Sequence, residues 1–567
     1  MEGESEYSFW HLLVRDVAYS QIPRAERARR HRSAAAWIER QAGERLEDLA
    51  EVLAHHYVEA LELARILGAG QEAEELEPHA RRCLALAGDR VYALDAERAE
   101  IYYRRALDLA PAGDPARGQL LARLGDVTQY TGRLPEAERL SEAAVEELRA
   151  HGDLLGAGQA MVTRALALWR LGRPEDERRR LVAHAIRTLE QMAPGQELAR
   201  AYARMGTEDL HAGRSVACCE WSLKAVAVAD RLGMEFLKCR PLQALGNARV
   251  DLGDLSGIDD MRRALQIGLE TGLSWETGTA YSNLGEVVWL LEGPAAGLDL
   301  KRAAVEFSAS RGLIYYEKYI RAEMLWLLFD LGAWDELLTS ADEGLAWDRD
   351  HGGSQVPMIA LTMKVRVLLS RGRAADASAL EPEYLPAARE IGDPQALVPA
   401  LATAAEARYA TGDTGGAVHL IEELEEKMRG RAVSRRVQEL PTAARICAGS
   451  GAIETARALL PSEEELFSGR ARHCVATAQA ALAEATGDVD EAQALYAAAA
   501  AGWQEFGNPG ERAYALLGEG RCLLELGRGG DAGSPLGKAR ELFAALKARP
   551  LVAEADGWLE QARALTP

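Results

Sequence analysis

The sequence predicts an all-α protein built as a solenoid of helical hairpins. Two observations lead to this prediction: residues that favour helices dominate the composition, and a glycine recurs along the chain at nearly constant spacing. Apolar residues make up 48% of the chain and aromatic residues only 6%, while Ala, Leu, Glu and Arg are abundant. Because 567 residues exceed what one compact core supports, a linear array of repeats is the expected architecture.

Each repeat is marked by a turn glycine between two stretches with helical patterning. Successive turn glycines lie 36 to 41 residues apart. They are Gly132, Gly172, Gly213, Gly253, Gly293, Gly332, Gly372, Gly412, Gly451, Gly487 and Gly527. A second series lies about halfway between them: Gly152, Gly195, Gly233, Gly272, Gly312, Gly352, Gly392, Gly430, Gly469 and Gly507. Since helices often end in a left-handed residue, which glycine adopts at little cost, each repeat is expected to hold two helices and two turns.

Small and apolar residues follow the helical period within each predicted repeat. The fifth residue after most turn glycines is small or apolar, as at Ala137, Leu298 and Ala417, with Glu177 as the exception. Before the turn, a large apolar residue followed by glycine recurs, as at Leu124-Gly125. A glycine inside a helix costs about 1 kcal/mol relative to alanine, so its recurrence predicts close helix crossings.

This pattern resembles the tetratricopeptide repeat, in which Leu-Gly, a turn Gly and two small positions of the second helix recur. The resemblance covers roughly residues 75 to 550. The period near 40 is longer than the ~34 residues usual for that family, and it also fits HEAT and armadillo repeats. The resemblance implies a right-handed α-solenoid of about twelve tetratricopeptide-like hairpins of ~40 residues, with a long concave surface. We assign the solenoid to 75–549 and a capping helix to 550–567.

The first sixty residues do not follow the repeat. The stretch Phe9-Trp-His11-Leu-Leu-Val-Arg-Asp-Val-Ala-Tyr19 resembles the last helix of the winged-helix domain in bacterial STAND-class signalling ATPases. The resemblance continues through Pro23–His31 and Ala50–Tyr57. It matches the junction between ATPase and repeats in proteins that also carry class III adenylate or guanylate cyclase domains, and in related transcriptional regulators.

The resemblance implies a winged-helix remnant over 1–22, which begins with a short strand, and a helical linker over 23–74. It also implies that His11 senses the phosphates of a bound nucleotide when an ATPase lies upstream. The chain itself contains no Gly-x-x-x-x-Gly-Lys-Ser/Thr loop. The nearest stretch, Gly533–Ala539, is one residue short and ends in Ala.

Charge and hydropathy exclude several classes of function. The formal net charge of −21 would repel a phosphate backbone, so direct nucleic-acid binding is not expected. The acidic N-terminus does not resemble a secretory signal, and no apolar run approaches the ~20 residues that span a bilayer. We therefore predict a cytoplasmic, non-catalytic protein that needs no cofactor and binds no membrane.

Other reactive side chains are assigned to packing or to the surface. His55 and His56 are neighbours on a predicted helix, where side chains diverge by about 100°, and no carboxylate lies at ligand spacing, so no metal site is predicted. Cys218, beside Cys219, occupies a small position of its repeat and is expected to pack as a hydrophobe. The basic run over 24–32 is interpreted as a solvated helix face.

Five residues are candidates for a binding groove. If the first helix of each repeat lines the concave surface, as in the tetratricopeptide family, the groove-facing residues are Tyr130, Trp169, His211, Asn247 and Trp289. Aromatic groups in such a groove would anchor a peptide or a small ligand. The alternative is that Trp169 and Trp289 belong to the core.

The sequence leaves three hypotheses for the function of this chain. The leading hypothesis is a sensor and interaction arm that binds a partner protein, a peptide or a small-molecule inducer and regulates an ATPase or signalling domain upstream. The alternative is a freestanding scaffold for complex assembly, in which residues 1 to 60 are a vestigial cap. The third, part of a nucleotide cyclase or ATPase with its own activity, is disfavoured because the phosphate-binding elements are missing from the sequence.

Overall fold

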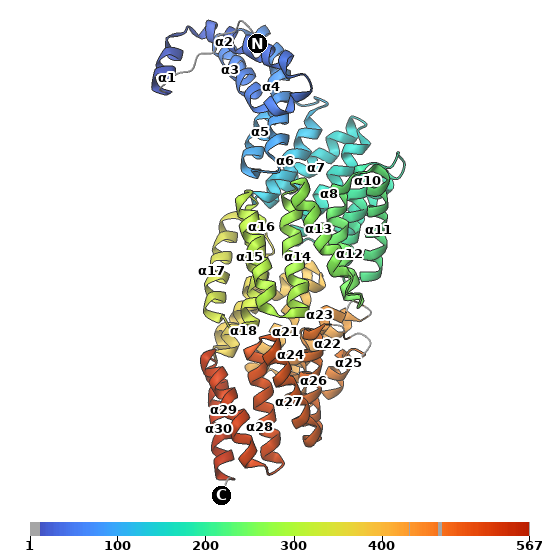
Figure 1. Ribbon diagram of the computed structural model, residues 1–567, viewed down its shortest axis with the longest axis vertical. Coiled ribbons are helices and arrows are strands. Elements are labelled where there is room, and N and C mark those ends of the chain that lie inside the picture. The colour runs from blue at the N-terminus through green and yellow to red at the C-terminus, as the bar shows by residue number, and fades with distance from the viewer. Residues whose placement is uncertain (1–11, 430, 432, 463–465, 467, 566–567) are drawn as a thin grey trace.

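The computed structural model describes residues 12–429, 431, 433–462, 466 and 468–565. Every regular element in this part of the chain is a helix, which confirms the prediction of an all-helical repeat protein. The molecule is elongated, with the first helices projecting as an arm from one end of the stacked hairpins (Figure 1). Phe9 and His11 lie outside the described residues, so the winged-helix remnant, its strand and the role of His11 stay predictions.

The N-terminal arm, residues 12–91, shares its apolar core with the start of the solenoid, at Ala106, Ala110 and Leu120. Its helices are α1 (Leu12–Gln21), α2 (Arg24–Ala42), α3 (Ala50–Ile66) and α4 (Gly70–Val91), with short 3-10 segments at Gly43–Arg45 and Glu47–Leu49. This core includes Leu53, Leu61 and Leu84, all nearly inaccessible to solvent. On α2, the basic run is largely exposed, and Arg30 pairs with Glu26 one helical turn earlier.

The first part of the solenoid consists of paired antiparallel helices. They are α5 (Ala96–Asp108), α6 (Arg117–Tyr130), α7 (Leu134–Ala150), α8 (Leu154–Arg170), α9 (Glu175–Leu189), α10 (Gln196–His211), α11 (Ser215–Leu232), a 3-10 segment (Glu235–Lys238), α12 (Cys239–Asp251), α13 (Gly257–Thr271), α14 (Trp275–Glu292), α15 (Pro294–Ser310), α16 (Ile314–Asp330) and α17 (Trp334–His351). The even-numbered helices from α6 to α16 are the first helices of their hairpins.

The second part continues the same stacking. Its helices are α18 (Val356–Ser370), α19 (Ala374–Ala379), α20 (Glu381–Ile391), α21 (Pro394–Ala410), α22 (Thr414–Met428), α23 (Val433–Val437), α24 (Leu440–Ser450), α25 (Ile453–Leu459), α26 (Gly469–Thr486), α27 (Val489–Phe506), α28 (Pro509–Glu525), α29 (Gly529–Ala545) and α30 (Arg549–Ala564). One apolar core runs from Val91 in α4 to Ala562 in α30.

Local sequence explains where these helices begin and end. Asp153 caps α8, because its carboxylate accepts a hydrogen bond of 2.8 Å from the backbone N–H of Gly156. Asn508 caps α28 in the same way through the N–H of Glu511, just before Pro509. All eleven predicted turn glycines have positive φ angles, as expected for residues that end a helix.

The halfway glycines follow the prediction less uniformly. Gly195 has an extended backbone and stands directly before α10, and Gly469 is the first residue of α26, so neither ends a helix as predicted. A helix can start after an extended residue as well as after a left-handed one, which the spacing alone does not distinguish. Gly430 lies outside the described residues.

The glycines inside helices mark the close crossings that the sequence predicts. A Cβ atom added to Gly125 in α6 would lie 2.7 Å from the hydroxyl oxygen of Ser141 in α7. At Gly206 in α10, the corresponding distance is 2.8 Å to the hydroxyl of Ser222 in α11. Both distances are shorter than real Cβ contacts, so these helix pairs approach as closely as they do because the side chain is absent.

Successive turns of the superhelix touch one another. Arg311 donates a 3.1 Å hydrogen bond to the carbonyl of Ala93, and Arg431 donates one of 3.0 Å to the carbonyl of Ala212. The side-chain amide of Gln355 donates to the carbonyl of Trp169. These pairs are separated by 218, 219 and 186 positions. Segments that are far apart in the sequence are therefore in direct contact.

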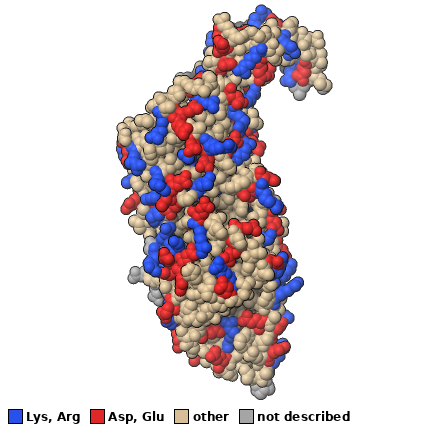
Figure 2. All heavy atoms as spheres, turned by 180° about the vertical axis from the view of Figure 1, so that it is seen from behind, with Lys and Arg blue, Asp and Glu red and all other residues tan. Residues whose placement is uncertain are grey.

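The outer surface carries charges of both signs. On the face seen in Figure 2, basic and acidic side chains are interspersed along the arm and the body. Among the described residues, no helix is both long enough and apolar enough to cross a membrane.

Candidate binding groove

The interior of the superhelix contains two chambers that meet at Arg240 and Trp275, and we call them together the inner groove. The upper chamber has a volume of about 380 Å³. It is lined by Tyr92, Asp126, Tyr130, Arg200, Arg204, Arg240, Trp275 and Glu276, among others. The lower chamber is narrower, at about 70 Å³. Its lining includes Trp169, His211, Arg240, Asn247, Trp275, Tyr316, Tyr319, Glu323 and Gln395.

The structure places three of the five predicted groove residues together in the lower chamber. Trp169, at the end of α8, stacks on His211, at the end of α10, with ring centroids 4.8 Å apart and an interplanar angle of 22°. Asn247 of α12 lines the same chamber and is half-buried. These residues meet because first helices of successive hairpins lie side by side, so equivalent positions near their C-terminal ends converge.

The other two predicted residues have different surroundings. Tyr130 of α6 lines the upper chamber and is 4% exposed. Trp289 of α14 is also nearly buried, and its indole N–H donates a 2.9 Å hydrogen bond to Asp330. It lines a third, smaller cavity next to the lower chamber. Trp289 therefore belongs to the core and borders a cavity next to the inner groove, not the groove itself.

Arg170, which the sequence analysis did not single out, lies at the centre of the aromatic groups. It is fully buried. Its guanidinium carbon lies 4.6 Å from the ring centroid of Tyr130, 5.2 Å from that of Tyr315 and 5.7 Å from that of Trp275. Such contacts stabilise a cation through the negative face of the rings. Its neighbour Trp169 was identifiable as a groove candidate, but nothing in the sequence distinguishes Arg170 from the many surface arginines.

Several hydrogen-bond donors in this cluster have no acceptor among the described residues. They are Nε, Nη1 and Nη2 of Arg170, Nε1 of Trp275 and the hydroxyl of Tyr315. Buried polar groups in proteins are nearly always hydrogen-bonded, because an unsatisfied one costs about 1–3 kcal/mol. Of these three residues, Trp275 lines both chambers, whereas Arg170 and Tyr315 line neither.

The charged groups of the upper chamber are affected by their burial. Burial raises the pKa of the Asp126 carboxyl, although Tyr92, which donates a 2.6 Å hydrogen bond to it, and Arg170 act in the opposite direction. Burial also raises the pKa of Glu276. Burial lowers the pKa of Arg240, whose guanidinium carbon lies 4.8 Å from the ring centroid of Trp275. The chamber thus presents both signs of charge in surroundings where a charged ligand group would interact strongly.

The cysteines take no part in this groove. Cys218 and Cys239 are completely buried, and burial raises the pKa of both thiols, that of Cys239 to about 12. Each thiol donates to a backbone carbonyl, of Ala244 and Ala264 respectively. A buried, protonated thiol is unreactive, which agrees with a packing role.

Comparison with known proteins gives similarities of structure alone. No family model matches the chain, and no curated protein sequence is similar to it. The chain is similar to the crystal structure of the APC/C hetero-tetramer Cut9–Hcn1, with 14% identity, a TM-score of 0.39, and coverage of 83% of this chain and 90% of that one. It is similar to a Rap protein complexed with the Competence and Sporulation Factor, with 12% identity, a TM-score of 0.38, and coverage of 65% and 98%.

A third similarity is to a Signal Transduction ATPase with Numerous Domains (STAND) protein with a tetratricopeptide repeat sensor from Pyrococcus horikoshii. The identity is 12% and the TM-score 0.37, and the alignment covers 87% of this chain and 68% of that one. At such identities and TM-scores, none of these similarities assigns a ligand or an activity to the inner groove.

Proposed function

We propose that this chain is a non-catalytic binding module that holds a segment of a partner protein or a peptide in its inner groove. The single observation that supports it best is the meeting of the two chambers at Arg240 and Trp275, whose indole ring is also contacted by the buried Arg170. Arg240 makes no salt bridge among the described residues, and a cation beside aromatic rings is suited to an acidic or carbonyl-bearing ligand. The ligand is accordingly expected to present Asp, Glu or a terminal carboxylate beside an apolar or aromatic residue.

The regulatory part of the proposal concerns domains upstream. The resemblance of Pro23–His31 and Ala50–Tyr57 to the junction of STAND-class ATPases supports a role in which ligand binding controls an ATPase or signalling domain. Reading the genomic DNA upstream of the Met1 codon, in frame, for a Gly-x-x-x-x-Gly-Lys-Ser/Thr loop tests this part. An open frame that carries the loop supports the sensor role, whereas a stop codon leaves a freestanding scaffold.

Binding can be tested without knowledge of the natural partner. A displayed library of random dodecapeptides is selected against the full chain, and the affinity of synthetic versions of the selected peptides is measured by calorimetry. We expect acidic peptides whose affinity falls at least about tenfold in Arg240→Ala and in Asn247→Ala. The control is Val216→Ala, a substitution on α11 at a residue that is 62% exposed and outside the groove. Peptides that bind all variants equally, or failure to select any peptide, would contradict the proposal.

A further inference from the structure

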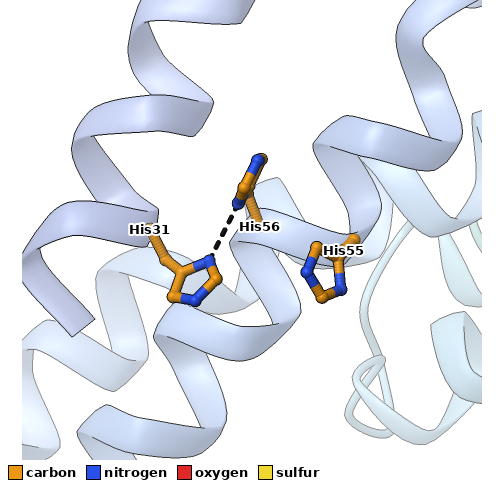
Figure 3. Close-up of side chains that lie close together, drawn as sticks. All are labelled: His31, His55 and His56. Carbon is orange, nitrogen blue, oxygen red and sulfur yellow. Dashed lines mark hydrogen bonds between the residues drawn. The ribbon is translucent and has the colours of Figure 1, made fainter. Parts of the chain in front are cut away.

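Three histidines of the N-terminal arm come together at the interface of α2 and α3, far along the chain from the inner groove. His31 belongs to α2, and His55 and His56 belong to α3. In Figure 3, the ring of His56 meets that of His31 across the gap between the two helices, while His55 lies beside them on α3. The ring centroids are separated by 5.1 Å for His31 and His56, 5.7 Å for His31 and His55, and 5.2 Å for His55 and His56. The three rings therefore form a nearly equilateral triangle.

The ring nitrogens are close enough to share one ion. One nitrogen from each of the three residues lies within 4.8 Å of the other two, and Nδ1 of His31 is 2.8 Å from Nδ1 of His56. Two imidazole nitrogens bound to the same tetrahedral Zn²⁺, each at about 2.0–2.1 Å, are about 3.3 Å apart. The His31–His56 pair needs to separate by only a few tenths of an ångström, and His55 needs to approach by at most about 1.5 Å, which a change of side-chain torsion supplies.

A hydrogen bond from α1 orients His31 in the way a metal ligand requires. The hydroxyl oxygen of Tyr19 is 2.8 Å from Nε2 of His31, on the side of the ring opposite Nδ1. When Nε2 carries the ring proton and donates to Tyr19, Nδ1 presents a lone pair to the other two histidines. Metal-binding histidines are held by just such a contact at their second nitrogen. With His31 in this form, the proton in the contact between the two Nδ1 atoms is carried by Nδ1 of His56. When an ion takes its place, that proton moves to Nε2 of His56.

We infer that His31, His55 and His56 form a binding site for a divalent transition-metal ion of the Zn²⁺ type. The donor set of three imidazoles, without carboxylate, suits Zn²⁺, Cu²⁺, Ni²⁺ or Co²⁺ and is unsuited to Mg²⁺ or Ca²⁺, which require oxygen ligands. His31 is 9% exposed, while His55 is exposed to solvent, so an ion has a path to the site. Burial lowers the pKa of His31 and of His56, which favours the neutral imidazole that binds metals.

The spacing within α3 could not reveal this site. Adjacent residues of a helix diverge, and that divergence led to the prediction of no metal site. The third imidazole comes from α2, and the packing of α2 on α3 brings it close to both His55 and His56. The alternative is that His31 and His56 form only a hydrogen-bonded packing contact, as buried histidines commonly do.

Such a site would join α2 to α3 within the arm. The three ligands all belong to α2 and α3, so stabilisation by a bound ion would be concentrated there. The consequence is a testable link between metal binding and the order of α1 to α3, independent of any ligand in the inner groove.

The test is an isothermal calorimetric titration with ZnCl₂. The full chain is first treated with a chelator, and the chelator is then removed. We expect one Zn²⁺ to bind per chain with micromolar or tighter affinity. In a parallel titration with CoCl₂, we expect the visible absorption of tetrahedral Co²⁺. His31→Gln and His56→Gln should each weaken Zn²⁺ binding at least about tenfold and remove the Co²⁺ absorption. The matched control is His79→Gln, which changes an exposed histidine of α4 outside the cluster.

Two results would overturn the inference. One is the absence of stoichiometric Zn²⁺ binding by the wild-type chain, and the other is equal binding by wild type, His31→Gln and His79→Gln, which would show adventitious surface binding. Because His31→Gln changes a nearly buried residue, far-ultraviolet circular dichroism of each variant establishes that the chain remains helical. The double variant His55→Gln/His56→Gln keeps His31 in place, and it should lose binding as well.

Discussion

The side-chain amide of Asn508 donates a 3.0 Å hydrogen bond to the carboxylate of Asp330, across 178 positions of the chain. The same carboxylate accepts a hydrogen bond from the indole N–H of Trp289 and pairs with the guanidinium of Arg470. Asp330 is 4% exposed, and it ends α16, so it joins the first part of the solenoid to α26 and to the cap of α28. This carboxylate therefore holds successive turns of the superhelix together.

Replacing Asp330 should destabilise the contact between turns strongly. In Asp330→Ala, the buried Arg470 loses its partner, and the unfolding free energy should fall by about 3–5 kcal/mol. Urea denaturation followed by circular dichroism measures the loss, and hydrogen exchange locates it in α14, α16, α26 and α28. The control Asp299→Ala, at a residue whose side chain is 80% exposed, should change little. Similar losses for both variants would argue against this role of Asp330.

Two glycines inside helices should respond to alanine with opposite signs. Gly206→Ala places a Cβ 2.8 Å from the hydroxyl of Ser222 and should lower the unfolding free energy by about 1–3 kcal/mol. Gly537→Ala, inside α29, meets nothing within 4 Å and should raise it by about 0.5–1 kcal/mol, because alanine favours helix. Thermal unfolding of the two variants, compared with wild type, measures the direction of each change in stability. Stabilisation by Gly206→Ala would contradict the close crossing of α10 and α11.

Arg170 should contribute to binding at the expense of stability. Arg170→Met keeps an unbranched, flexible but shorter side chain and removes a buried cation that has no hydrogen-bond acceptor among the described residues. We expect the unfolding free energy to rise by about 1–2 kcal/mol, while affinity for acidic peptides selected on the groove falls. Denaturant midpoints and calorimetry measure the two quantities on the same samples. A variant that is destabilised and still binds normally would show that the guanidinium serves packing alone.

The metal-free arm should lose stability in mild acid through His56. Burial, then the neighbouring His31 and His55, lower the pKa of His56 to about 4, whereas Glu59 acts weakly in the opposite direction. Above pH 6.5 the ring is neutral in both states; as pH falls from 6.5 towards 4, only the unfolded state binds the proton, so stability decreases.

The decrease should be on the order of 2 kcal/mol, after allowance for partial solvent exposure of the ring. Urea midpoints in the presence of a chelator, at pH 4.5 and pH 7.5, compare wild type with His56→Gln. The variant should lose less stability between these two conditions. An equal loss of unfolding free energy in wild type and His56→Gln would show that other groups cause the acid sensitivity. NMR titration would then measure the pKa of His56 directly.

The sequence by itself determined the helical class and most of the hairpin turns. Turn glycines such as Gly132 and Gly332 were identifiable because a positive φ angle and a fixed repeat length leave a periodic signal in the chain. The crossing at Gly125 was identifiable for a related reason, since a glycine inside a helix is unfavourable unless a neighbour requires it. Helix, turn and crossing are local or nearest-neighbour properties of a repeat array.

Only the tertiary structure decided what lies across the turns of the superhelix. The stacking of Trp169 on His211 follows from adjacent repeats, and the repeat pattern predicted that both residues face the groove. Three features depend on the pitch of the array and on the angle between helices: the contact of Asp330 with Asn508, the burial of Arg170 without an acceptor among the described residues, and the meeting of His31 with His56. Those quantities arise from small rotations summed over many packed side chains, so no local pattern of residues encodes them.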